Sequence, residues 1–277
     1  MRSHGLTVQT KGRAVRVITI GNEKGGVGKT STTVHLAAAL GLTGLRVLVI
    51  DLDTQAHATQ WFGVPVARVI PERSSYAVLV GQTALGPTLV RTEEENVALC
   101  AAHPFLAKAA KELGDQVDGI FALRDAIDAF AESETGKPFD LAIIDCPPAR
   151  GTVVFNALLT ADLVIAPVLA EALSVQGLVA LEETVQRIRQ RFAPDLTPPL
   201  ILINNYEGRA AIDRQLYDDL HQQYGAQMME TVIGRDAPLR EAFLAQSSIF
   251  RHRRTARSAG QFHALADEVL RRLHAAT

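Results

Sequence analysis

Residues 22–31, with the sequence Asn-Glu-Lys-Gly-Gly-Val-Gly-Lys-Thr-Ser, constrain the fold of this chain more than any other stretch. An apolar run at 15–20 precedes them, and a run with helical character at 31–42 follows them. A strand, a glycine-rich loop and a helix in this order form the setting in which phosphate-binding loops occur. The sequence therefore predicts a nucleotide site at the end of a strand.

The residue types in this loop suit a bound triphosphate. Glycines let the main chain approach an anion closely, and the helix that follows adds the positive end of its dipole. Lys29 would reach the β- and γ-phosphates, and the hydroxyl of Thr30 would coordinate Mg²⁺. We expect ATP contacts from the whole loop, namely Gly25, Gly26, Val27, Gly28, Lys29, Thr30 and Ser31.

One position departs from the ordinary pattern G-x-x-x-x-G-K-[ST]. Glu23 stands where the first glycine belongs, and Lys24 places a second lysine just inside the loop. A glycine-rich turn without a ligand is the alternative interpretation. The Gly-Lys-Thr sequence between a strand and a helix favours the nucleotide site.

Composition limits the remaining classes of function. The chain has 277 residues, of which 47% are apolar, enough for one large α/β domain. A net charge of −2 excludes a globally basic nucleic-acid binder, so any DNA contact needs a local patch. Two cysteines without a C-x-x-C pair, no run of 18 apolar residues and a non-apolar stretch at 1–14 predict a cytoplasmic protein with a flexible N-terminal extension.

Two further apolar runs end on acidic residues. The run at 46–50 leads to Asp51 and Asp53, and the run at 140–144 leads to Asp145. Continuous Val/Ile/Leu runs are typical of parallel strands, whose carboxyl ends bind ligands in open α/β sheets. Asp145 would contact Mg²⁺ directly or through water. One of Asp51 and Asp53 would support the metal while the other orients the attacking water, and a helix cap is the alternative for either.

Strand and helix patterns alternate along the rest of the chain. We expect one doubly wound α/β domain over 15–277, with a mostly parallel sheet flanked by helices. The further strands are predicted at 96–101, 162–168, 199–204 and 228–233. Helices are predicted at 75–80, 104–113, 119–131, 172–192, 211–224, 236–245 and 259–274.

Five stretches resemble motifs of one family, the ParA/MinD group of ATPases. Residues 22–31 resemble its deviant Walker A motif, and 49–59 resemble its D-x-D-P-Q-G-N-A-T switch. The stretches 143–148, 156–167 and 231–242 are similar to its Walker B segment and to two later motifs, so the likeness covers about 15–274. Thr54, Ala56 and Gly234 depart from the family pattern in the switch and near the adenine.

The resemblance implies a role for each matching residue. Lys24 fits the signature lysine, which crosses to the partner's phosphates when two subunits enclose two ATP molecules. Asp53 fits the hydrolytic aspartate, and Asn204 fits an adenine-recognising asparagine. Arg235 and Asp236 belong to a loop expected to close over the base. Mg²⁺ would be held by Thr30, Asp51 and Asp145, with Lys24, Lys29 and Asp53 as the catalytic set.

An arginine-rich stretch lies where ParA-type proteins place basic residues that contact DNA. Clustered arginines bind phosphates without sequence preference. A solvated surface run is the alternative. The candidates are Arg251, Arg253, Arg254 and Arg257, with Arg235 and Arg209 as weaker ones.

The function that this resemblance implies is a ParA-type positioning ATPase. ATP would close a homodimer that binds DNA non-specifically on the nucleoid, and a cargo-bound, ParB-like adaptor would stimulate hydrolysis. The cargo would be a plasmid, a chromosome or a cellular machinery such as the division site. A MinD-like membrane cycle is the first alternative, but the C-terminal tail is too short for a membrane-binding helix, so no stable membrane association is expected. A metabolic enzyme with the same loop and a degenerate nucleotide-binding scaffold are the others.

Overall fold

The central sheet is assembled from strands that are far apart in the chain. The computed structural model describes residues 15–169, 172–208 and 211–275. Within these residues the sheet has seven strands in the order β3-β4-β2-β5-β1-β6-β7, and only β3 is antiparallel to its neighbour. They are β1 (Arg16–Ile20), β2 (Val47–Asp51), β3 (Leu89–Arg91), β4 (Val97–Cys100), β5 (Leu141–Asp145), β6 (Leu163–Leu169) and β7 (Leu200–Asn204).

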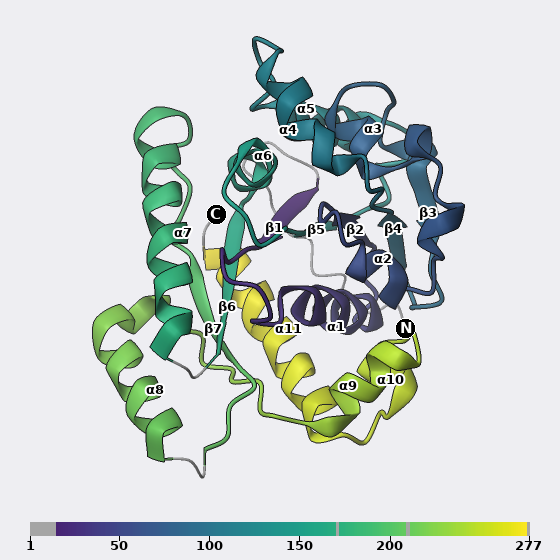
Figure 1. Ribbon diagram of the computed structural model, residues 1–277. Coiled ribbons are helices and arrows are strands. Elements are labelled where there is room, and N and C mark those ends of the chain that lie inside the picture. The colour runs from purple at the N-terminus through teal and green to yellow at the C-terminus, as the bar shows by residue number, and fades with distance from the viewer. Residues whose placement is uncertain (1–14, 170–171, 209–210, 276–277) are drawn as a thin grey trace.

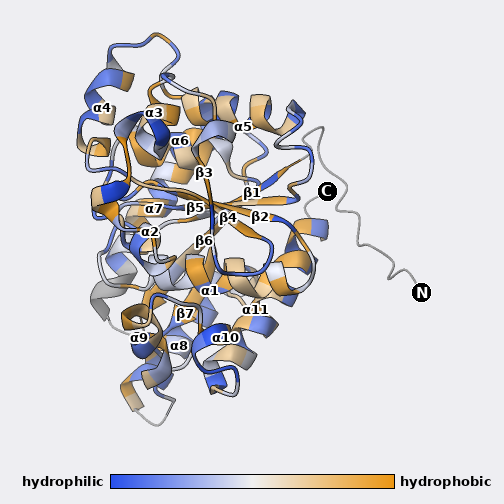
Figure 2. Cartoon of the chain, turned by 90° about the vertical axis from the view of Figure 1, so that its right-hand side faces the viewer, coloured by the Kyte–Doolittle hydropathy of each residue, from blue (hydrophilic) through white to orange (hydrophobic). Residues whose placement is uncertain are grey.

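Helices cover both faces of this sheet (Figure 1), so the strands are apolar on both sides. One face packs against α1 (Lys29–Leu42) and α11 (Arg257–Ala275), which receive Ile18 and Ile143. The other face packs against α3 (Ser75–Leu79), α4 (Leu106–Gly114), α5 (Ala122–Glu132), α6 (Thr152–Thr160), α7 (Ala172–Arg191) and α8 (Ala211–Tyr224). Figure 2 shows the hydrophobic strands between two layers of helices with more hydrophilic outer surfaces. The predicted doubly wound α/β class is confirmed.

The strand order places three functional segments at one edge of the sheet. β5 lies between β1 and β2, and Asp145 is in register with both Ile20 and Asp51. The glycine-rich loop follows β1 directly, so it lies beside the carboxyl ends of β5 and β2. Three short helices, α2 (His57–Trp61), α9 (Ala237–Leu244) and α10 (Ile249–His252), complete the side near α1.

The expected strand at 228–233 is not formed. Met229 and Ile233 each donate one main-chain hydrogen bond to β7, but only isolated bridges result. The amides of Glu230 and Thr231 instead donate to the carboxylate of Glu268, at 2.8 and 2.9 Å. A buried glutamate on α11 therefore replaces the strand ladder, and the spacing of residues along 228–233 cannot reveal it.

A histidine is buried in the core between α1, α2 and α11. His35 has no exposed surface, and its Nδ1 accepts a hydrogen bond from the Ile249 amide at 3.2 Å. The ring lies 5.2 Å from the Trp61 ring and 4.9 Å from the Phe262 ring, between centroids. Burial lowers the pKa of His35 to about 3, so the imidazole is neutral in the folded protein.

This buried imidazole predicts a loss of stability in mild acid. Below its ordinary pKa of about 6.5 the unfolded chain binds a proton at His35, whereas the folded chain does not until about pH 3. The free energy of unfolding should therefore fall on acidification, by up to about 1.4 kcal/mol per pH unit from this group. His35→Asn keeps an acceptor near Nδ1 but does not titrate. Its unfolding free energy in urea should depend less on pH between 6.5 and 5, and equal slopes in the two proteins would contradict this prediction.

Candidate nucleotide site

The loop between β1 and α1 has a backbone that requires glycine at two positions. Gly26 and Gly28 have φ angles of 77° and 93°, in the left-handed region. A Cβ atom at residue 28 would also lie 1.9 Å from Nδ2 of Asn204. The loop is thus shaped both by its own glycines and by the end of β7.

Four hydrogen bonds fix the conformation of this loop. Asn22 donates from Nδ2 to the Pro167 carbonyl at 2.8 Å and accepts the Lys24 amide at Oδ1 at 2.9 Å. Asn204 donates from Nδ2 to the Val27 carbonyl at 2.9 Å. The Lys29 ammonium reaches back to the Lys24 carbonyl at 2.9 Å, inside the loop. The structure therefore adds Asn22, which sequence reasoning did not single out, and gives Asn204 a structural contact with the loop.

A buried carboxylate faces the first turn of α1. Asp145 accepts hydrogen bonds from the hydroxyls of Thr30 at 2.8 Å and Thr33 at 3.2 Å. Burial, reinforced by the nearby charge of Asp51, raises the pKa of Asp145 well above its ordinary value. Burial also lowers the pKa of the Lys29 ammonium, and the surrounding acids oppose this shift. A cation at this position would offset the cost of these buried negative charges.

These oxygens suit Mg²⁺ only in company with phosphates. No group of three or more His, Cys, Asp or Glu side chains in the described part of the chain has the geometry of a metal site. Mg²⁺ is usually bound through one or two carboxylates together with substrate phosphates. The hydroxyl of Thr30 and the carboxylate of Asp145 fit that pattern.

Asp51 holds the segment that contains Asp53. Its Oδ2 accepts hydrogen bonds from the Thr59 amide and hydroxyl at 2.8 and 2.7 Å, and its Oδ1 accepts the Asp53 amide at 3.1 Å. Burial raises the pKa of Asp51 to about 6, although these hydrogen bonds lower it. Ala56, within this segment, has a φ of 52°, a conformation that costs a residue with a Cβ atom about 1–2 kcal/mol. The family's glycine at this position avoids that cost.

Asp53 borders an open cavity. It is 7% exposed, and its Oδ1 accepts the Gln55 amide at 2.9 Å. The cavity, of about 340 Å³, lies between residues 52–55 and 147–154. The three acids predicted at the ends of two strands, Asp51, Asp53 and Asp145, therefore lie close together, and Asp53 and Asp145 lie near Lys29.

A second cavity, of about 830 Å³, adjoins the other side of the loop. It is lined by two glycines, by polar side chains and by apolar side chains. The glycines are Gly26 and Gly234, the polar residues are Ser31, Asn204, Asn205, Arg235, Asp236 and Arg240, and the apolar residues are Trp61, Leu169, Leu239, Phe243 and Leu244. The structure thus brings together all three residues predicted to recognise the base. Two of them are engaged elsewhere as well: Arg235 pairs with Glu207, and Asp236 accepts the Ser258 amide at 3.0 Å. The aromatic wall was not predicted.

Glu23, the residue in place of the first glycine, has a partner. Its carboxylate accepts a hydrogen bond from Nε of Arg150 at 2.5 Å, and Arg150 also lies 3.9 Å from Glu183 on α7. Arg150 lines the cavity next to Asp53. The glutamate that replaces the first glycine therefore forms an ion pair, which links the loop to the segment after Asp145. A solvent-accessible pair of this kind contributes little to stability.

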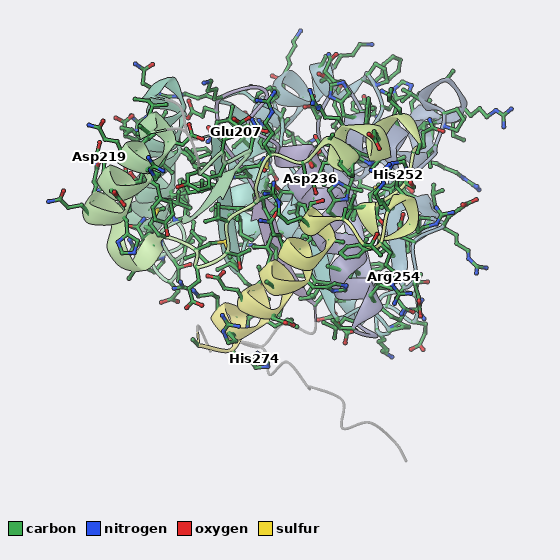
Figure 3. The ribbon with its side chains drawn as sticks, turned by 90° about the horizontal axis from the view of Figure 1, so that it is seen from below. Glu207, Asp219, Asp236, His252, Arg254 and His274 are labelled. Carbon is green, nitrogen blue, oxygen red and sulfur yellow. The ribbon has the colours of Figure 1, made fainter. Side chains whose placement is uncertain are left out.

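The predicted DNA-contacting arginines gather near α10 but are mostly paired. Arg251 pairs with Glu93 and lies 3.8 Å from Glu94, and Arg253 lies 3.1 Å from Glu241. Arg257 donates to the main-chain carbonyl of Arg235 at 2.6 Å. Arg254 is exposed and has no ion pair among the residues that the structure describes (Figure 3). Arg209 lies outside the described residues.

None of the helices that the structure describes is long and apolar enough to cross a membrane.

Comparison with known proteins identifies relatives along most of the chain. The sequence model of an AAA domain matches residues 15–198. The chain is 35% identical over 262 residues to the chromosome-partitioning ATPase Soj of Thermus thermophilus, covering 95% of this chain and 98% of that protein. It is 32% identical over 228 residues to the chromosome partitioning protein ParA of Caulobacter vibrioides, covering 82% and 84%.

Solved structures share the fold. The cobyrinic acid a,c-diamide synthase of Mycobacterium smegmatis, solved with bound ADP and magnesium, is 31% identical, with a TM-score of 0.78 and coverage of 93% of this chain and 94% of that one. The cell division ATPase MinD of Pyrococcus furiosus superposes with a TM-score of 0.71 over 92% of this chain and 98% of its own, at 23% identity. The second likeness concerns the fold alone.

Proposed function

The chain belongs to the ParA/Soj family of ATPases, and from this membership we propose that it hydrolyses ATP and uses the nucleotide to switch a dimer that binds DNA. The observation that carries the proposal is the buried Asp145 beneath the glycine loop, hydrogen-bonded to Thr30 at 2.8 Å and close to Lys29 and Asp53. Phosphoryl transfer to water needs positioning and charge neutralisation more than covalent chemistry. This cluster supplies both.

Each residue has a task in this proposal. Lys29 and the loop amides hold the β- and γ-phosphates, and Thr30 with Asp145 holds Mg²⁺. Bound Mg²⁺ neutralises the charge that develops on the phosphates. Asp53 orients the attacking water molecule and accepts a proton from it. Asp51 keeps Asp53 in place through the Asp53 amide and Thr59. Its carboxylate, close to that of Asp145, would add negative charge that favours Mg²⁺.

The same proposal extends to two subunits. The half-buried Lys24 lies on the loop, and its side chain serves the phosphates of a second copy. Asn204, Arg235 and Asp236 bind the base. A cargo-bound adaptor resembling ParB in function stimulates hydrolysis and releases the DNA, because loss of ATP removes the contacts that favour the dimer.

The arginines near α10 provide the DNA contact, with Arg254 the most available. With ATP bound, Arg254→Glu should weaken binding to non-specific duplex DNA roughly tenfold at low salt. The slope of the logarithm of the binding constant against the logarithm of the salt concentration should decrease in magnitude by about one, the value for one lost phosphate contact. Lys137→Glu, on the turn before β5, is the matched control because it makes the same charge change and should bind as the wild type does. Fluorescence anisotropy across a salt series measures both. Equal effects of the two substitutions would move the DNA contact away from α10.

The diamide synthase likeness favours one other candidate, an ATP-dependent amidation. Such an enzyme consumes ATP only with an acceptor carboxylate and an amine donor present. Phosphate release from purified protein with Mg²⁺–ATP and DNA, but without any acceptor, therefore separates the two functions. Turnover that rises with DNA supports the positioning ATPase, and turnover that requires an acceptor supports the amidating enzyme.

A further inference from the structure

Trp61 occupies a junction between the base cavity and the segment before α10. It is the only tryptophan in the chain, it is 8% exposed, and it lines the cavity of about 830 Å³. Its ring lies 5.0 Å from that of Phe243, another residue of the cavity wall. Its Nε1 donates a hydrogen bond to the main-chain carbonyl of Ser247 at 2.9 Å. The Trp61 side chain thus contacts both the wall of the base cavity and the segment before α10.

The segment Ser247–Ile249 is fixed by buried hydrogen bonds from three directions. Trp61 binds its first residue, as described. Glu94, in the turn between β3 and β4, accepts the amide and the hydroxyl of Ser248, both at 2.8 Å. His35 on α1 accepts the Ile249 amide. The segment starts α10, so its position sets that of the arginine run, which we define as Arg251, Arg253, Arg254 and Arg257.

Two of these three supports belong to elements that carry the nucleotide site. α1 begins with Lys29 and Thr30 at the phosphates and presents His35 one and a half turns later. α2 contains Thr59, whose amide and hydroxyl bind Asp51, and ends at Trp61. A shift of the segment that holds Asp53 therefore moves Trp61. The third support, Glu94, belongs to the β3–β4 turn and does not line the base cavity.

We propose that Trp61 transmits occupancy of the nucleotide site to the arginine run, by contacting the base cavity with its ring and Ser247 with its indole N–H. The proposal rests on the ATP and DNA binding proposed above. A ligand shifts such an equilibrium only by binding its two states unequally, and Trp61 provides the unequal contact. When the cavity is filled, the ring is fixed against Phe243 and the hydrogen bond to Ser247 persists. When it is empty, the ring lacks the contact with the ligand, and the hydrogen bond to Ser247 opens more often.

The first experiment follows the segment without DNA. Hydrogen exchange of the peptide covering 247–254 is measured in the full-length protein with saturating Mg²⁺–ATP and without nucleotide. Exchange should be at least threefold slower with ATP in the wild type and equal in the two states in Trp61→Phe, which keeps an aromatic ring but lacks the N–H donor. A nucleotide effect that persists in Trp61→Phe would overturn the proposal, as would no effect in the wild type.

The second experiment compares DNA affinity with saturating ATP and without nucleotide, and saturation ensures that any change in nucleotide affinity does not matter. The ratio should fall about fivefold or more in Trp61→Phe. Ser248→Ala is the matched control, because it weakens the same segment from the side of Glu94 and should keep the ratio. Equal losses in both variants would reduce Trp61 to a packing role. If the wild type binds no DNA while its exchange still responds to ATP, the proposed DNA function fails and the role of Trp61 stands.

Discussion

Replacing Lys24 with alanine should abolish ATP turnover and leave ATP binding within a few fold of the wild type. The contacts that shape the loop here are made by the main chain of Lys24, its amide to Asn22 and its carbonyl to Lys29, and alanine keeps both. The lost ammonium is the group proposed to reach the partner's phosphates. A cation delivered across an interface to a transferring phosphoryl group contributes about 10³-fold or more to kcat.

The measurement pairs phosphate release with the binding of a fluorescent ATP analogue. Lys111→Ala, which removes an exposed lysine of α4, is the control for a general effect of lost positive charge. A Lys24→Ala protein that no longer binds the analogue would show that the side chain serves its own subunit's loop. Unchanged turnover would remove Lys24 from the reaction.

The loop and the acids at the strand ends could be predicted because they depend on neighbours in sequence. Asp145 closes an apolar run that is typical of a covered strand, and the strand order places it beside the loop. The periodicity of residues also predicted most helices within two or three positions. β3 was missed because it has three residues and an acidic turn, which give too little pattern for a strand.

The contacts that organise the site join residues far apart in the chain. Glu23 binds Arg150, 127 residues away, and Trp61 binds Ser247, 186 residues away. Neither contact can be recognised from residue spacing or composition in the sequence. Each forms only because separate segments of the chain pack beside one another on the folded sheet. The same holds for the partners of Arg251 and Arg253, whose acidic neighbours change an apparently free basic run into a largely paired one.

Replacing Asp53 with alanine should slow hydrolysis by about 10²–10⁴-fold, the usual contribution of a group that orients and deprotonates a nucleophile. ATP would then stay bound, and the protein should elute as a dimer in size-exclusion chromatography with Mg²⁺–ATP and as a monomer with Mg²⁺–ADP. Asp53→Asn is the matched control, because its amide oxygen can still accept the Gln55 amide. If Asp53→Asn hydrolyses ATP normally, the alanine effect is a local loss of structure. A monomer with ATP in both variants would count against the dimer switch.

Mixing the two inactive proteins tests whether the site is shared. In the proposed dimer each ATP is attacked with the help of Asp53 from its own subunit and Lys24 from the other. A heterodimer of Lys24→Ala and Asp53→Ala subunits therefore holds one site with both groups intact and one site with neither. Turnover should appear on mixing and approach half of the wild-type rate per heterodimer. If both groups served the same subunit, no site in the mixture would be complete, and the mixture would stay as inactive as its parts.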